Sequence, residues 1–161
     1  MKRKISLSMC CIAAFSVLIT ALMISLVLYN RNYKNMTNYI QNEAEYMAAA
    51  MNYNGVEYLD SVKDVSPSRI TWIANDGNVI FDNSGKKMEN HSDRSEFKEA
   101  IKSGIGESSR LSETLGKKTY YYAILMNDGT VLRISDTTSS IFSDIFSSLP
   151  SVSYTHLRAH E

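Results

Sequence analysis

The sequence predicts an α+β protein, in which one N-terminal transmembrane helix precedes a domain with a five-stranded antiparallel sheet flanked by helices. Three features of the 161-residue chain support this fold class. Residues 5–29 contain no charged side chain. Two Asn-Asp-Gly motifs, at 75–77 and 127–129, are each flanked by segments rich in β-branched and aromatic residues. Apolar residues recur at helical spacing before the first of these segments and after the last.

The uncharged segment at 5–29 is long enough to cross a membrane, because about 20 apolar residues span the hydrocarbon core. A cleaved signal peptide is the alternative, but its apolar region is normally about 7–15 residues and ends at a small-residue cleavage site. Three basic residues, Lys2, Arg3 and Lys4, precede the segment. Because basic residues remain on the cytoplasmic side, we expect residues 1–29 to form a cytoplasmic tip and a transmembrane helix, with the domain outside the cell membrane.

The composition of the remaining chain excludes several classes of protein. Residues 30–151 carry 13 Lys and Arg against 16 Asp and Glu, so no basic surface for nucleic acid is expected. The two cysteines, Cys10 and Cys11, lie in the apolar segment, and so no disulfide framework supports the domain. No serine or cysteine has a histidine and an acid at a recognisable catalytic spacing. We therefore expect neither catalytic residues nor a cofactor.

A second helical pattern covers residues 30–52. Its apolar residues recur at spacings of 4, 7 and 4: Met36, Ile40, Met47 and Met51. This spacing places them on one side of a helix, and we expect that side to pack against the domain. Gly55 is predicted to end the helix as a left-handed cap, and a short second helix is expected over 56–62.

The first two strands are predicted to form a hairpin. Residues 69–74 (RITWIA) and 78–82 (NVIFD) have strand composition, and Asn, Asp and Gly between them tolerate the positive φ of a tight turn. A polar loop then leads to a helix over 94–102, which Ser92 or Asp93 can cap. The buried face of that helix is predicted to contain Phe97, Ala100 and Ile101.

Three more strands complete the predicted sheet. Residues 106–113 alternate weakly, and 119–126 (TYYYAILM) are nearly continuously apolar, which predicts a central strand covered on both faces. Residues 130–135 follow the second turn motif as the last strand. Because short connections favour antiparallel neighbours, the five strands are expected to form one antiparallel sheet. A final helix is expected to begin at 139.

This order of elements resembles the PAS-like extracytoplasmic sensor domains of membrane receptors (single Cache or PDC type). Five stretches sharpen the resemblance: ITWIANDGNVIFD at 70–82, MENHSDRSE at 88–96, ESSRLSETLG at 107–116, YYYA at 120–123 and DGTVLR at 128–133. Together they resemble the sensor region of phosphate-regulon-type (PhoR-like) sensor histidine kinases of Gram-positive bacteria. The resemblance covers the chain from residue 2 to about residue 146.

The resemblance implies a homodimer in which the helices at 30–52 pair. Met36, Ile40, Met47 and Met51 would then be shared between the domain core and the dimer contact. It also implies a second membrane span, a HAMP linker, a phosphoacceptor-histidine helix pair and an ATP-binding domain. None of these is recognisable in this sequence, so we expect the chain itself not to be an enzyme, and to reach a response regulator only through that missing kinase part.

The expected organisation is a sensor domain at 30–138, a helix at 139–151 leading to a second span, and a foreign tail at 152–161. The tail (VSYTHLRAHE) interrupts the apolar helix and resembles the translation of a sequencing adapter. The stimulus is expected to be an extracellular ligand or protein of unknown identity. Two other interpretations stay open: a sensor domain of a chemoreceptor or diguanylate cyclase, and a membrane-anchored interaction module.

Three arginines and two tyrosines are the candidate ligand-binding residues: Arg94, Arg110, Tyr120, Tyr122 and Arg133. Arginine binds anionic groups through paired hydrogen bonds, and alternate tyrosines share one face of a strand. The alternative is that these arginines pair with nearby acids on the solvated face. The expected partners would be Glu107, Glu113 or Asp136 for Arg110 and Arg133, and Glu89 or Glu96 for Arg94.

Glu89, His91 and Asp93 alternate in the polar loop and are weak candidates for metal ligands, because imidazole and carboxylates bind divalent cations. No second group of ligands lies nearby in the sequence. A polar loop with Asp93 near a helix start is therefore the favoured interpretation, and no metal site is predicted.

Overall fold

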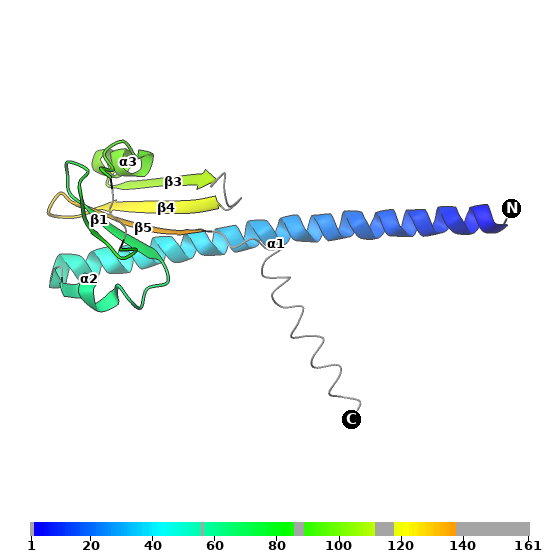
Figure 1. Ribbon diagram of the computed structural model, residues 1–161, viewed down its shortest axis with the longest axis horizontal. Coiled ribbons are helices and arrows are strands. Elements are labelled where there is room, and N and C mark those ends of the chain that lie inside the picture. The colour runs from blue at the N-terminus through cyan, green and yellow to red at the C-terminus, as the bar shows by residue number, and fades with distance from the viewer. Residues whose placement is uncertain (1, 56, 86–88, 112–117, 138–161) are drawn as a thin grey trace, which may run out of the picture. The chain divides into compact units, whose positions relative to one another are not determined.

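The computed structural model describes residues 2–55, 57–85, 89–111 and 118–137 (Figure 1). The chain divides into two compact units, Met1–Asn35 and Met36–Glu161. The first contains the beginning of a long helix, and the second contains the end of that helix, two short helices and a five-stranded sheet. The predicted α+β class is confirmed. The helix expected over 139–151 and the tail at 152–161 lie outside the described residues.

Helix α1 (Lys2–Asn54) is one uninterrupted helix of 53 residues. In its first half the large apolar side chains are exposed, from Ile5 to Leu28. The hydroxyls of Ser8 and Thr20 donate hydrogen bonds of 2.9 Å to backbone oxygens three and four residues earlier. The helix thus presents an apolar surface with these hydroxyls satisfied internally. In the part of the chain that the structure describes, it is the one helix long and apolar enough to cross a membrane.

The last turns of α1 pack their predicted apolar side against the sheet. The buried residues on this side are Ile40, Ala44, Met47, Ala48 and Met51. They join one core cluster with residues of the sheet, including Ile70, Tyr122, Leu132 and Ile134. Burial of one large apolar side chain contributes about 1.5–3 kcal/mol, so this contact fixes α1 firmly to the sheet.

Gly55 ends α1 as predicted. Its φ is 69°, in the left-handed region, and its N–H donates a 2.8 Å hydrogen bond to the Met51 carbonyl. The chain then turns into α2 (Glu57–Val62), which buries Leu59 completely. The short second helix is therefore confirmed.

The sheet contains β1 (Arg69–Ile73), β2 (Val79–Asp82), β3 (Ile105–Leu111), β4 (Lys118–Leu125) and β5 (Val131–Thr137). Its order is β2-β1-β5-β4-β3, and every neighbouring pair is antiparallel. All five predicted strands are thus present. The prediction that the apolar strand at 119–126 is central was wrong in one respect: β4 is interior, but β5 lies at the centre, because β5 also pairs with β1.

Both Asn-Asp-Gly motifs form the tight turns that the sequence predicts. In the first, the Ala74 N–H donates to the Asn78 carbonyl at 2.8 Å. In the second, the Met126 N–H donates to the Thr130 carbonyl at 2.8 Å. These turns set the register of the β1–β2 and β4–β5 hairpins, and so decide which side chains share a face of the sheet.

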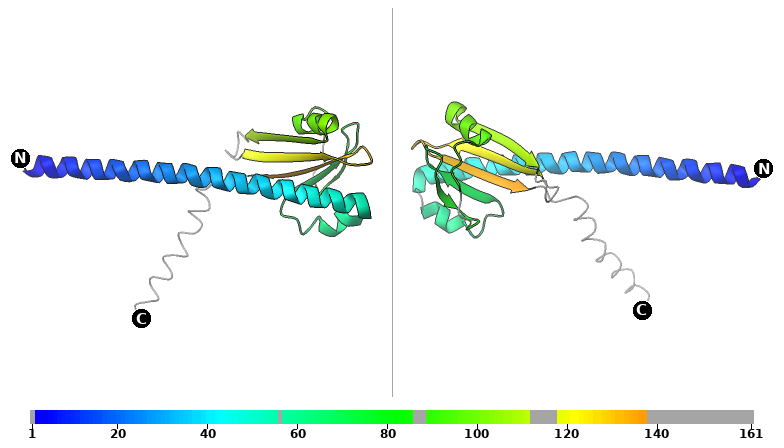
Figure 2. Two further views of the ribbon diagram at one scale, coloured as in Figure 1. Left: turned by 180° about the vertical axis from the view of Figure 1, so that it is seen from behind. Right: turned by 45° about the horizontal axis from the view of Figure 1, so that its top comes forward.

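The end of α1 covers one face of the sheet, and α3 (Ser95–Ser103) lies on the other (Figure 1, Figure 2). The α3 side has its own small core, formed by Ile73, Phe97, Ala100, Ala123 and Val131. Gly106 in β3 lets the helix approach, since a Cβ there would lie 2.0 Å from the Glu96 carbonyl oxygen. This close approach determines where the first turn of α3 meets the sheet.

Two details of α3 differ from the sequence prediction. The helix starts after Arg94, which occupies the N-cap position without a side-chain cap, so neither Ser92 nor Asp93 caps it. The Asp93 carboxylate instead pairs with Lys98 at 3.2 Å. Ile101, predicted to be buried, is 37 % exposed because the side of α3 that meets the sheet runs through Phe97 and Ala100.

Candidate functional site

Helix α3 carries one acidic residue, Glu96, on the side that faces the sheet. Its side chain is fully buried. A carboxylate is almost never fully buried unless it is paired. The residues around Glu96 therefore decide what this part of the domain can do.

Both oxygens of the Glu96 carboxylate accept hydrogen bonds from the sheet. Oε1 accepts from Arg133 Nη1 at 3.2 Å. Oε2 accepts from Ser108 Oγ at 2.7 Å and from Arg110 Nη2. One carboxylate thus joins the central strand β5 to the edge strand β3, beneath the first turn of α3.

The aromatic ring of Tyr121 lies beside both guanidinium groups. Its centroid is 4.3 Å from Arg110 Cζ and 5.2 Å from Arg133 Cζ. Both distances fall within the range of cation–π attraction. Tyr121 therefore supports the two arginines on the same sheet face on which Glu96 pairs with them.

The network continues across the sheet through Thr71 to the opposite edge strand. Arg133 Nη2 donates to Thr71 Oγ1 at 3.2 Å, and Thr71 Oγ1 donates to Asp82 Oδ2 at 2.9 Å. Asp82 also pairs with Arg69 Nε at 3.0 Å. The charged cluster, defined as Arg69, Asp82, Arg133, Glu96 and Arg110, thus contains three cations and two anions.

Burial and pairing oppose each other in setting the charges of this cluster. Burial alone would raise the pKa of Glu96, but the hydrogen bonds from Arg110 and Ser108 outweigh it and lower the pKa to about 2. Burial lowers the pKa of Arg133, while the Glu96 carboxylate raises it. Glu96 is therefore ionised at neutral pH, and the cluster keeps one excess positive charge.

Two buried polar atoms, one in the cluster and one outside it, have no hydrogen-bond partner in the described chain: Arg133 Nε and His91 Nδ1. His91 is 4 % exposed, and its N–H donates to the Gly77 carbonyl at 2.7 Å through the backbone. Burial lowers the pKa of His91 to about 4, and Arg133 adds repulsion. The imidazole is thus neutral at physiological pH, and protonation would place a further cation beside Arg133.

The structure brings together only part of the predicted ligand-binding set. Arg110 and Arg133 share the α3 side of the sheet, whereas Tyr120 and Tyr122 are buried on the α1 side. Tyr120 donates its hydroxyl to Glu107 and accepts from Gln41 Nε2 at 3.0 Å. An aromatic pocket formed jointly by these arginines and tyrosines is therefore not present.

The expected surface pairings of the arginines were also wrong. Arg110 and Arg133 pair with Glu96, and neither pairs with Glu107 or Asp136; Glu113 lies outside the described residues. Arg94 is exposed at the start of α3 and forms no ion pair with another described residue. The strands hold the two buried arginines on the α3 side, where Glu96 is the nearby acid.

The three candidate metal ligands do not converge. His91 is buried, whereas Glu89 and Asp93 are exposed. Among the residues that the structure describes, no group of three or more His, Cys, Asp or Glu side chains could hold a metal ion. His91 is therefore better understood as a neighbour of the charged cluster.

Glu96 and Tyr121 were not predicted to be site residues, although the sequence pattern indicates which way each side chain faces. Glu96 precedes Phe97 and lies one helical turn before Ala100, which places it on the buried side of α3. Tyr121 alternates with Tyr120 and Tyr122 and must therefore face the other side of β4. Four residues of α1 that were predicted to share one side of the helix contribute to the core or pack against it: Met36, Ile40, Met47 and Met51.

The comparisons with known proteins decide the family. A model of the Single Cache-like family matches residues 30–132. The chain belongs to this family. Comparison with curated proteins and with solved structures gives no match.

Single Cache-like domains are extracytoplasmic sensor modules of receptors, and the matched region contains the last turns of α1, α3 and the first residues of β5. The charged cluster lies within this Cache domain, except for Arg133 at the residue after the match. The Cache domain and the apolar half of α1 fit a membrane protein with an extracellular sensor domain.

Proposed function

We propose that this chain is the input segment of a sensor histidine kinase, with the N-terminus of α1 in the cytoplasm and the Cache domain outside. One observation supports this role above the others. Helix α1 is continuous from its apolar half into the core of the Cache domain, without an intervening loop. A change in the packing of Ile40, Met47 or Met51 would therefore act on the same helix that crosses the membrane.

The charged cluster provides a place where a stimulus can act on the domain. An anionic group could bind Arg110 and Arg133 in place of the Glu96 carboxylate, because all three groups meet at one point of the sheet. Release of Glu96 would free the first turn of α3. A ligand shifts such an equilibrium only if it binds one arrangement more tightly than the other.

The functional form is proposed to be a homodimer, with its contact on the side of α1 that is turned away from the sheet. Ile40, Met47 and Met51 are buried against the sheet and cannot also meet a partner. The opposite side of α1 exposes Tyr46 (77 %) and Tyr53 (91 %), with Ala49 between them. Their spacing of 3 and 4 is that of a coiled-coil contact, and two anchored copies would meet there in parallel.

The test is to read the uninterrupted gene downstream of codon 151 and to assay the complete protein in proteoliposomes with γ-labelled ATP. A phosphoacceptor histidine and acid-labile, base-stable phosphorylation would support the kinase proposal. A methyl-accepting signalling domain or a diguanylate cyclase domain in that position would contradict it. If kinase activity is found, Glu96→Gln is expected to change its rate, whereas Glu99→Gln, on the exposed side of α3, is not.

A further inference from the structure

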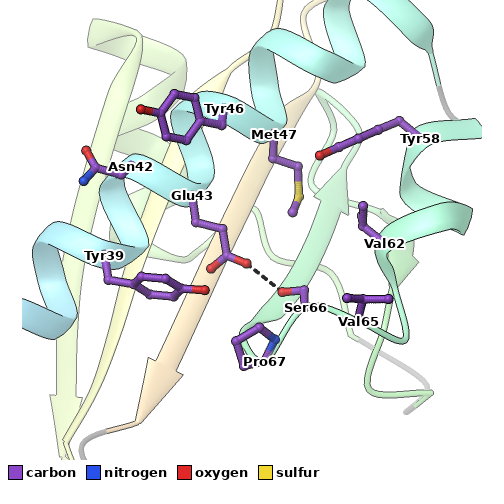
Figure 3. Close-up of a pocket in the computed structure, with 10 residues that line it drawn as sticks. All are labelled: Tyr39, Asn42, Glu43, Tyr46, Met47, Tyr58, Val62, Val65, Ser66 and Pro67. Atoms are coloured by element: carbon purple, nitrogen blue, oxygen red, sulfur yellow. Dashed lines mark hydrogen bonds between the residues drawn. The ribbon is translucent and has the colours of Figure 1, made fainter.

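A second site lies on the other side of the Cache domain, between α1, α2 and the segment that leads into β1 (Figure 3). It is an open cavity of about 540 Å³, which is within the range of small-molecule sites. Its walls include Tyr39, Glu43, Met47, Tyr58 and Val62. None of these residues belongs to the charged cluster, so the cavity is a separate feature of the domain.

The floor of this cavity carries one carboxylate, Glu43, which is half-buried. Its two oxygens accept hydrogen bonds from Ser66 Oγ at 2.7 Å and Ser68 Oγ at 2.5 Å. These bonds fix the orientation of the carboxylate without neutralising it. Within the described chain no Lys, Arg or His forms an ion pair with Glu43.

Aromatic and thioether groups surround the carboxylate. Tyr39 approaches from α1 and Tyr58 from α2, while the side chain of Met47 extends between them (Figure 3). Burial raises the pKa of Tyr39, and the Glu43 charge raises it further, so this phenol stays neutral. The faces of neutral tyrosine rings attract cations.

We propose that this cavity binds a small organic ammonium ion that carries apolar substituents. The ammonium group neutralises Glu43, and the substituents contact the Tyr39 and Tyr58 rings and Met47. An anion would be repelled by Glu43, and a neutral apolar molecule would bury this carboxylate without a counter-charge. Because Met47 is also part of the core between α1 and the sheet, the bound ion would stiffen the helix that enters the membrane.

The test uses the full chain in a maltoside detergent, which contains no cation, with choline as the probe. Its control ligand is 3,3-dimethylbutan-1-ol, which has the same shape without the charge. Saturation-transfer NMR of the methyl signals gives the two dissociation constants. We expect choline to bind about fivefold to tenfold more tightly than the neutral alcohol. Equal affinities, or no binding of either, would overturn the proposal.

Variants test which side chains produce the preference for choline over the neutral alcohol. Glu43→Gln is expected to weaken choline binding about fivefold to tenfold and to remove the preference for the charged ligand. Glu45→Gln, an exposed acid two residues away, is expected to leave both constants unchanged. An equal loss of choline affinity in the two variants would mean that binding depends only on the general surface charge, and the proposal would fail.

A second pair of variants remains informative if Glu43→Gln does not fold. Tyr58→Phe keeps an aromatic face and is expected to keep choline affinity within about twofold, whereas Tyr58→Ala is expected to reduce it several-fold. Unchanged affinity in Tyr58→Ala would overturn the proposal. These results do not depend on the kinase assignment.

Discussion

Glu96 and Arg133 form an ion pair across the interface between α3 and the central strand, with 3.2 Å between Oε1 and Nη1 and side-chain exposures of 0 % and 3 %. The removal of two charges from water largely offsets the attraction between them. The net contribution of the pair to stability is therefore small, whereas the loss of one partner is costly. The pair fixes the position at which α3 meets the sheet.

Replacement of Glu96 by Gln is expected to destabilise the domain. Arg133 would be left buried without its counter-ion, which costs about 3 kcal/mol in the free energy of unfolding. Urea denaturation followed by circular dichroism measures this loss. Glu99→Gln, at an exposed position of the same helix, keeps an oxygen that can accept the 3.2 Å hydrogen bond from the Glu107 N–H, and so it should change the value by less than about 0.5 kcal/mol.

The double variant Glu96→Met/Arg133→Met separates two contributions to the free energy of unfolding: the loss caused by one unpaired buried charge and the net contribution of the ion pair. With both charges absent, most of the lost stability should return. Arg110, which is 33 % exposed, can then reach water. Additive losses in the double variant would contradict the coupling that the 3.2 Å contact implies.

His91 is expected to make stability depend on pH in mildly acidic solution. Its pKa is about 4 in the folded state, against about 6.5 in an unfolded chain. Between these values the unfolded chain binds the proton more readily, so stability falls as the pH falls from about 6.5 towards 4. The slope can reach about 1.4 kcal/mol per pH unit.

The measurement is the free energy of unfolding of wild type and His91→Gln at several pH values from 7.5 to about 4. The variant should show a flatter profile in this window, because the titrating group is gone. Above about pH 7 the two profiles should run parallel, since the imidazole is then neutral in both states. Identical slopes below pH 6.5 would show that burial of His91 does not govern the acid response.

Gly106 is expected to be sensitive to the smallest substitution. In Gly106→Ala the new Cβ would lie 2.0 Å from the Glu96 carbonyl oxygen, so α3 would have to move away from β3. We expect a loss of at least about 2 kcal/mol in the free energy of unfolding. Leu111→Ala, at an exposed position at the end of the same strand, is the control and should lower the free energy of unfolding far less. Equal losses would show that α3 accommodates the methyl group.

The sequence was sufficient to predict the strands, the two hairpin turns and the packed side of α1. These follow from local spacing and turn chemistry, such as the 4, 7 and 4 spacing of Met36 to Met51. The charged cluster was not predictable as a whole. Its members come from β1, β2, β3, β5 and α3, and the order β2-β1-β5-β4-β3 that brings them together depends on the β1–β5 pairing between distant segments.

Two adjacent residues of α1 allow the proposed contact between copies of the chain to be tested separately from the core. Met47 is 4 % exposed and packs against the sheet, whereas Tyr46 is 77 % exposed. Met47→Glu would bury a charge without a partner, and so it is expected to lower the free energy of unfolding by several kcal/mol. Tyr46→Glu should change it by less than about 0.5 kcal/mol, but two like charges would face each other in a parallel dimer.

Sedimentation velocity of the full chain in detergent, together with urea denaturation, distinguishes the two effects. Tyr46→Glu is expected to shift the chain from dimer to monomer while its circular dichroism stays native. Tyr46→Phe keeps the apolar ring and should remain dimeric. A dimer that survives Tyr46→Glu and Tyr53→Glu together would place the contact elsewhere than the exposed side of α1. Met47→Glu would then remain informative only about the core, because its side chain is covered by the sheet of its own chain.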